Sequence, residues 1–119
     1  MFTYKSNNMK TIILMLHIVT ATIYNAVPSQ TDDTPNITAT GFVIDLNNPA
    51  KHRIIAVSRD LEAKGFTMNS KVCIENAGPM NGEWIIRDRM NRRFKNRIDF
   101  LVNNNIRLGK WNNVSIKKL

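Results

Sequence analysis

Runs of alternating apolar and polar residues recur along this chain, and they predict a protein built from strands. Side chains of a strand point alternately to its two faces, so a period of two is typical of a half-buried strand. Such runs, rich in β-branched residues, span residues 36–44, 53–57, 71–75, 83–88, 97–102 and 111–119. Between them, residues 58–65 have helical character, with Ser58 as a candidate cap and Gly65 as a stop signal.

This order of elements predicts an all-β fold. About six short strands, without a helix long enough for a parallel crossover, are typical of a small closed β-barrel. The polar segments 45–52, 76–82 and 103–110 are interpreted as the loops between strands. A length of 119 residues suits one domain of roughly 100 residues. We therefore expect a six-stranded barrel with one or two short helical turns.

The N-terminus has the pattern of a secretory signal. After Met9, an alternative start, a lysine precedes an apolar stretch that ends at Tyr24. A positive start, a short apolar middle and small residues are the order of a signal peptide, and a membrane span needs ~20 apolar residues. We expect a signal peptide over residues 1–26, a flexible lead-in over 27–35 and the barrel domain over 36–119. An uncleaved anchor or a buried helix is the alternative.

The charge favours an anionic partner. Seventeen Lys and Arg against nine Asp and Glu leave a net charge of +8. Nucleic acid, an anionic membrane surface and a charged cell-wall polymer all suit a basic protein. Export argues against nucleic acid, and we expect membrane contact only if the N-terminal segment is uncleaved. The wall polymer is the partner that fits best.

The scarcity of histidine and cysteine limits the chemistry. The chain has one cysteine, Cys73, and beyond the expected signal peptide one histidine, His52. These are too few for a zinc site of the usual kind, and they exclude familiar Ser-His-Asp and Cys-His nucleophile systems. We expect no metal and no cofactor. Any catalysis therefore falls to carboxylates.

Two carboxylates enclose the most basic stretch of the chain, DRMNRRFKNRIDF at residues 88–100. In the last strand run of this stretch, alternation turns Ile98 and Phe100 toward the core and Asp99 outward. Asp88 ends a strand on which it shares a face with Trp84, at a place where a carboxylate can line a cleft. The alternative for each aspartate is a solvated or salt-bridged side chain, which the neighbouring arginines favour.

The segments IAVSRDL, NGEWIIRDRMNRRFKNRIDF and RLGKWNNVSIKKL resemble the 3D domain, a family named for three aspartates. That family is similar to the double-psi β-barrel of membrane-bound lytic transglycosylase A and, more distantly, to the rare lipoprotein A and expansin barrels. The resemblance covers roughly residues 36–119 and places the family's three aspartates at Asp60, Asp88 and Asp99. Asn96 and Arg97 match the residues that precede the third one.

The chain departs from the family pattern at three glycines. Met90 and Asn91 stand where two glycines follow the second aspartate, and Lys95 stands at a later glycine. Asn91 suits a turn with positive φ, because asparagine tolerates that region better than most residues. Met90 and Lys95 fill positions where glycine would let a sugar chain approach the backbone. This departure concerns the substrate geometry, not the fold.

The resemblance implies a double-psi β-barrel, exported to the periplasm or cell envelope of a bacterium, that cleaves peptidoglycan glycan strands. In the family's proposed mechanism one carboxylic acid protonates the glycosidic oxygen. The resulting carboxylate then helps the C6 hydroxyl of the sugar attack C1, which leaves a 1,6-anhydro product. We assign this role to Asp99, with Asp88 and Asp60 raising its pKa or orienting the sugar. Nearby arginines would lower that pKa unless they point elsewhere.

We expect Asn91, Asn96 and Arg97 to contact the glycan. Two other functions stay open. A non-catalytic, expansin-like wall-binding barrel is favoured by the filled glycine positions. A basic nucleic-acid binder would use RRFKNR as its patch and Phe94 as a stacking residue.

Overall fold

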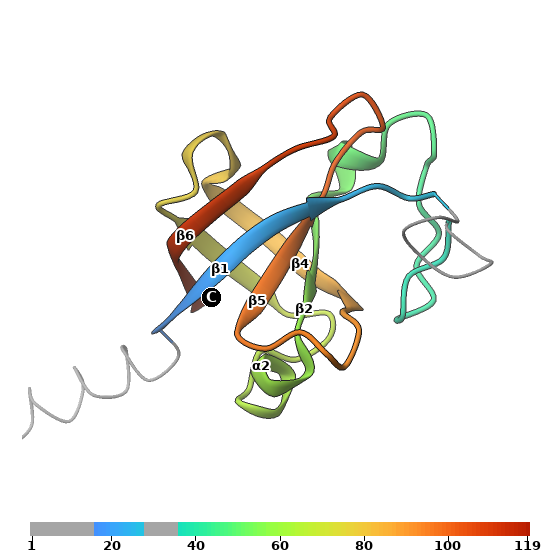
Figure 1. Cartoon of the computed structure of the whole chain (residues 1–119). Coiled ribbons are helices and arrows are strands. Elements are labelled where there is room, and N and C mark those ends of the chain that lie inside the picture. Colours follow the sequence, from blue (N-terminus) through green and yellow to red (C-terminus); the bar gives the residue numbers. More distant parts are fainter. Residues whose placement is uncertain (1–15, 28–35) are drawn as a thin grey trace, which may run out of the picture.

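The computed structural model describes residues 16–27 and 36–119, and its strands close into a barrel (Figure 1). The strands are β1 (Leu16–Tyr24), β2 (Ile54–Val57), β3 (Lys71–Glu75), β4 (Gly82–Arg89), β5 (Arg97–Leu101) and β6 (Lys110–Lys118). The helical elements are short: α2 (Arg59–Ala63) and two 3-10 turns, η1 (Pro49–His52) and η2 (Gly78–Met80). The prediction of a six-stranded all-β barrel with few helical turns is confirmed.

The strands follow the order β1-β5-β2-β4-β3-β6 around the barrel. The pairs β1–β5 and β2–β4 are parallel, whereas β1–β6, β2–β5, β3–β4 and β3–β6 are antiparallel. Every strand has two neighbours, so the closed sheet leaves no free edge for pairing with another chain. This mixed topology is compatible with a double-psi β-barrel.

The barrel interior is filled by alternating side chains from every strand. Each strand contributes two buried residues to one cluster: Val19 and Ala21, Ile55 and Val57, Val72 and Ile74, Trp84 and Ile86, Ile98 and Phe100, and Val114 and Ile116. Leu61 of α2 and Phe66 close one end of this core. Burial of an aliphatic or aromatic side chain stabilises the fold by about 1.5–3 kcal/mol, so each strand is held by its inward residues.

A second apolar cluster lies on the opposite face of the sheet. It contains Tyr24, Ala26, Ile44, Ile54, Ala56, Met90 and Leu101. Because neighbouring residues of a strand point to opposite faces, Ile54 and Ala56 belong to this cluster while Ile55 and Val57 fill the interior. The segment around Ile44 covers part of this face, which carries the candidate carboxylates described below.

The first strand is not where the sequence predicts it. Residues 36–44 form no strand and contain a single isolated bridge, Ile37 to Val43. The first strand is β1 instead, within the stretch expected to be a signal peptide, and it pairs with both β5 and β6 (Figure 1). The apolar stretch that contains β1 fits a signal peptide, but its residues also alternate as in a strand, with Val19 and Ala21 pointing inward.

The barrel therefore begins at Leu16, not at residue 36, and cleavage after residue 26 would remove β1. The signal-peptide assignment itself stays a prediction. The rest of that segment, residues 1–15, and most of the expected lead-in, residues 28–35, lie outside the described residues. In the part of the chain that is described, no helix has the length and hydropathy needed to span a membrane.

Candidate functional site

A row of four residues crosses the sheet on the face opposite to the interior. Thr22 of β1 lies beside Asp99 of β5, which lies beside Ala56 of β2, which in turn lies beside Asp88 of β4. The outward orientation expected for Asp99 is confirmed, because its neighbours Ile98 and Phe100 fill the core. The row therefore places two of the three predicted aspartates, Asp88 and Asp99, on either side of Ala56.

A break in strand register turns Asp88 toward this row. β2 and β4 pair Ile55 with Ile86, but the next pair is Ala56 with Asp88, so one residue of β4 is extra. Such a bulge re-aims the side chains that follow it. The expectation that Asp88 shares a face with Trp84 is therefore wrong, since Trp84 packs in the interior while Asp88 reaches Tyr24 on the other face.

Tyr24 connects the first strand to the second carboxylate. Its hydroxyl donates a hydrogen bond to Asp88 Oδ2 at 3.2 Å, and its ring is buried in the second cluster. Burial, followed by the charges of Asp88 and Asp99, raises the pKa of the Tyr24 phenol well above its usual value. Tyr24 is thus a protonated donor at neutral pH. Sequence reasoning missed it because it ends the stretch read as a signal peptide.

Asp99 has the properties expected of a carboxylic acid that holds its proton. Its carboxylate accepts a hydrogen bond from the Thr22 hydroxyl. Burial raises the pKa of Asp99, while the Thr22 hydrogen bond and the positive charge of Arg97 lower it, and the net shift is upward. Asp99 therefore stays protonated to a higher pH than an ordinary aspartate.

Two of the arginines expected to oppose this shift point elsewhere. Arg89 forms a two-pronged salt bridge with Glu62 of α2, with nitrogen–oxygen distances of 2.7 and 2.8 Å. Arg87 lies over the ring of Phe42 and bonds to Asn69. Arg97 is thus the arginine whose charge still lowers the pKa of Asp99.

Asp88 also anchors the segment that covers this face. Its Oδ1 accepts hydrogen bonds from the backbone N–H of Ala39 at 3.1 Å and of Arg89 at 3.0 Å. Thr40 N–H in turn donates to the carbonyl of Arg87 at 3.3 Å. Together with the Tyr24 hydroxyl, Ala39 and Arg89 give the Asp88 carboxylate three donors from different segments.

Asp60 has a different position from the other two aspartates. It lies in α2, and its Oδ2 accepts a hydrogen bond from the backbone N–H of Asn96 at 2.9 Å, at the start of β5. Burial raises the pKa of Asp60, but hydrogen bonds from Ser58 and from backbone amides outweigh it, so the net shift is downward. Asp60 is thus an ionised group that fixes the loop before Arg97.

Ser58 is the N-cap residue of α2, as the sequence predicts, but its side chain does not cap the helix. Its hydroxyl makes no cap hydrogen bond to α2 and instead accepts one from Arg97 N–H at 3.1 Å. Its own N–H donates to the Arg97 carbonyl at 2.9 Å. Ser58 and Asp60 together hold the first residues of β5, and hence the register that places Asp99.

The residues expected to contact the glycan have structural partners. Asn96, with φ of 51°, binds the Ile18 carbonyl and the ring of His17, which ties the loop to β1. Asn91 does not have the positive φ expected of it, and its side chain accepts from Arg93 N–H in a local turn. The left-handed residue of this loop is therefore Asn96.

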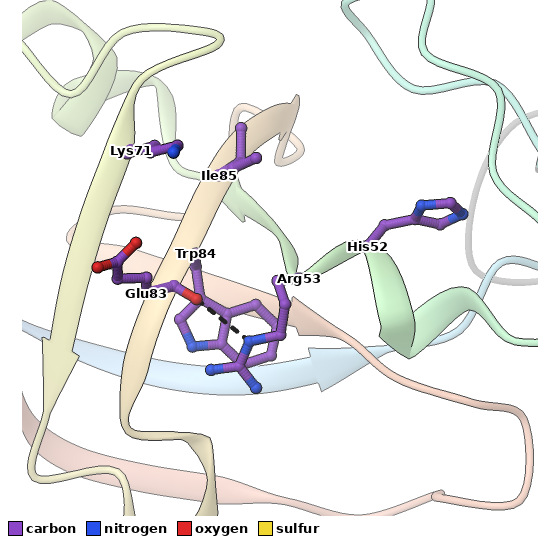
Figure 2. Close-up of a pocket in the computed structure, with 6 residues that line it drawn as sticks. All are labelled: His52, Arg53, Lys71, Glu83, Trp84 and Ile85. Atoms are coloured by element: carbon purple, nitrogen blue, oxygen red, sulfur yellow. Dashed lines mark hydrogen bonds between the residues drawn. The ribbon is translucent and has the colours of Figure 1, made fainter.

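A cavity lies on a different part of the barrel, lined by His52, Arg53, Lys71, Glu83, Trp84 and Ile85 (Figure 2). The guanidinium of Arg53 covers the indole of Trp84, with its Cζ 3.8 Å from the ring centroid, and its Nε donates to the Glu83 carbonyl at 3.1 Å. None of the three aspartates lines this cavity. The guanidinium of Arg53 in this cavity is stacked on Trp84, a residue of the core.

Within residues 16–27 and 36–119, no group of three or more His, Cys, Asp and Glu side chains is arranged to hold a metal ion. Comparison of the chain with protein-family models, with curated proteins and with solved structures finds no match. The function of this protein is therefore inferred from its sequence and from the geometry of its site.

Proposed function

We propose that this protein is an exported enzyme that cleaves the glycan strand of peptidoglycan, on a barrel of the double-psi, 3D-domain type. Such an enzyme would act in the periplasm or cell envelope of a bacterium. The observation that supports this most is the environment of Asp99, a half-buried carboxyl with a raised pKa beside a second carboxylate and a phenol. The net charge of +8 suits an anionic wall polymer.

In the proposed reaction Asp99 acts twice. As an acid it donates its proton to the glycosidic oxygen, and the bond from that oxygen to C1 breaks. As a carboxylate it then accepts the proton of the C6 hydroxyl, whose oxygen bonds to C1 and forms the 1,6-anhydro ring. The proton lost in the first step is recovered in the second, and no water is consumed because the C6 hydroxyl of the sugar itself is the nucleophile. General acid–base assistance of this kind contributes about 10²–10⁴-fold in rate.

The neighbours of Asp99 have supporting roles in this proposal. Asp88 carries a negative charge near the sugar, which stabilises the positive charge that develops at C1. Tyr24 orients Asp88 through its hydroxyl, and Thr22 orients Asp99. Asp60 acts at a distance by fixing the start of β5.

A non-catalytic wall-binding barrel is the second candidate. Met90 is buried in the second cluster and Lys95 is exposed, at two of the positions where the family has glycine. Side chains there make the backbone less accessible to a sugar chain, which favours binding along the surface over cleavage in a groove.

Product analysis separates the two candidates. Purified glycan strands are incubated with the protein, and the soluble muropeptides are analysed by mass spectrometry for 1,6-anhydro ends. Anhydro products support the lytic enzyme. Strands that bind to the protein and remain uncut support the binding barrel.

A further inference from the structure

Two arginines pack on one aromatic ring in the loop between β4 and β5. The Cζ atom of Arg93 lies 4.7 Å from the centroid of the Phe94 ring, and the Cζ atom of Arg97 lies 5.2 Å from it. Both distances are within the ~6 Å range of cation–π contacts. Phe94 itself packs against the second cluster, the one that contains Tyr24 and Leu101. The stacked guanidinium groups are therefore held at a fixed place on the outer face.

These two guanidinium groups have no protein acceptor among the described residues, in contrast to Arg53, Arg87 and Arg89. Arg89 is paired with Glu62, and Arg53 donates to two backbone carbonyls. Stacking covers the flat face of a guanidinium and leaves its N–H edge accessible. That edge fits a carboxylate or a phosphate with two parallel hydrogen bonds.

The stack lies next to the proposed acid. Arg97 and Asp99 are alternate residues of β5, so they point to the same face and are separated by roughly 7 Å along the strand. The charge of Arg97 acts on Asp99 without a salt bridge between them. A group bound at the stack would therefore belong to the sugar beside the bond that Asp99 protonates.

We propose that Arg93 and Arg97, stacked on Phe94, bind an anionic substituent of the glycan, a carboxylate or a phosphate, beside Asp99. This inference rests on the proposed function for the identity of the polymer. It adds a specificity rule: the site selects glycans that carry an acid group on the sugar next to the scissile bond and discriminates against neutral chains with the same backbone.

Anion binding at this site has a consequence for Asp99. Burial raises its pKa, while Thr22 and Arg97 lower it, and Asp88 and Tyr24 lie on the same face. A bound anion offsets the charge of Arg97, so the pKa of Asp99 rises further when the acidic substrate binds. The substrate would thus favour the protonation state that its own cleavage needs.

Binding is tested without cleavage, in an Asp99→Asn background, by calorimetric titration with three ligands. These are glycan strands with intact peptide carboxylates, the same strands bearing phosphate with the carboxylates amidated, and a neutral chito-oligosaccharide. Arg93→Gln and Arg97→Gln should each weaken binding of an acidic strand by about ten-fold or more. Arg92→Gln, in the same loop, should change it by less than about three-fold, because Arg92 is not stacked on Phe94 and contributes only a screened surface charge. The acidic ligand that shows this loss identifies the substituent.

Binding of acidic strands by Arg93→Gln and Arg97→Gln as tight as that by Arg92→Gln would overturn the inference. An equal loss of affinity for the neutral oligosaccharide would also overturn it, since the site would then not discriminate between charged and neutral glycans. Arg97→Lys keeps the positive charge but lacks the two parallel N–H donors of a guanidinium. A folded Arg97→Lys variant should therefore show an intermediate loss of affinity for acidic strands. A wild type that binds acidic strands through these arginines but releases no anhydro product would refute the proposed cleavage and leave this site intact.

Discussion

The phenol of Tyr24 in β1 donates a hydrogen bond to Asp88 at the end of β4, although β5 and β2 lie between these strands in the sheet. This contact links two segments that are 64 residues apart in the chain. It also places the aromatic ring close to both aspartates of the candidate site, since the charges of Asp88 and Asp99 both act on the phenol. The site therefore depends on β1 being part of the barrel.

Removal of the Tyr24 hydroxyl should loosen Asp88 without opening the core. We expect Tyr24→Phe to keep the fold, because the ring stays buried, and to lose about 0.5–1.5 kcal/mol of unfolding free energy with the hydrogen bond. Glycan cleavage should fall by roughly ten-fold as Asp88 loses its orientation. Chemical denaturation and the initial rate of muropeptide release measure the two effects.

A double-mutant cycle with Asp88→Asn provides the control for this prediction. If the hydroxyl acts through Asp88, Tyr24→Phe should have little further effect on the rate once Asp88 is changed. Fully additive losses in rate would show that the two side chains act independently.

The place of β1 in the barrel predicts the effect of truncation. A chain that starts at residue 27 lacks the strand that pairs with both β5 and β6, and it loses Val19 and Ala21 from the core. We expect it to show no cooperative thermal transition, because two strand edges and part of the interior would be exposed. A chain that starts at residue 16 keeps every described strand pair and should melt cooperatively.

The same pair of chains decides how the N-terminus is processed. A mature protein whose N-terminal sequence begins near residue 27, and which still melts cooperatively, would contradict the role of β1 as a strand of the barrel. A mature protein that retains residues 16–24 would agree with it.

Some parts of this structure could be predicted because the local pattern alone determines them. The strand run at 97–102 has Ile98 and Phe100 on one face, and the structure buries both in the interior. Asp99 then had to point outward, which is where it lies. A period of two in a half-buried strand needs no knowledge of the partners of that strand.

Other features depend on tertiary partners and could not be predicted. The apolar run that contains β1 fits a signal peptide as well as a strand, and only its pairing with β5 and β6 decides between them. The face of Asp88 is set by a register shift against β2, which alternation within one strand cannot show. The role of Asp60 follows from a hydrogen bond to Asn96, which is 36 residues away in the chain.

The ion pair between Glu62 and Arg89 predicts a stability that depends on pH. The hydrogen bond from Arg89 lowers the pKa of Glu62 in the folded protein. The pair therefore contributes to the unfolding free energy above the pKa that Glu62 has in the unfolded chain, and this contribution is lost as pH falls through the pKa of the folded protein. Glu62→Gln should reduce the unfolding free energy by up to about 1 kcal/mol at pH 7 and by almost nothing near pH 2.

Urea denaturation at both pH values measures this difference. Glu83→Gln is the matched control, because Glu83 is exposed on β4 and makes no ion pair in the described part of the chain. Equal losses of unfolding free energy for Glu62→Gln and Glu83→Gln at pH 7 would show that the ion pair does not stabilise the fold.

The contribution of Asp99 to stability should change with pH in the opposite direction to that of Glu62. Burial raises its pKa, so its contribution to stability is present below the unfolded pKa of about 3.9 and is lost as pH rises through the folded pKa. Asp99→Asn cannot ionise, so its stability relative to wild type should increase as pH rises over this window. Thermal melts across that range measure the trend, and a difference that does not change with pH would show that Asp99 has an ordinary pKa.

The most direct measurement of the central claim is the release of anhydro-muropeptides by wild type and Asp99→Asn from purified glycan strands. The substitution keeps the size of the side chain and its contact with Thr22, but it cannot transfer a proton. We predict that wild type releases 1,6-anhydro products, and that Asp99→Asn, folded and still bound to the strands, is slower by about 10²–10⁴-fold. Release by a well-folded Asp99→Asn at the wild-type rate, or no release by wild type, would contradict the account.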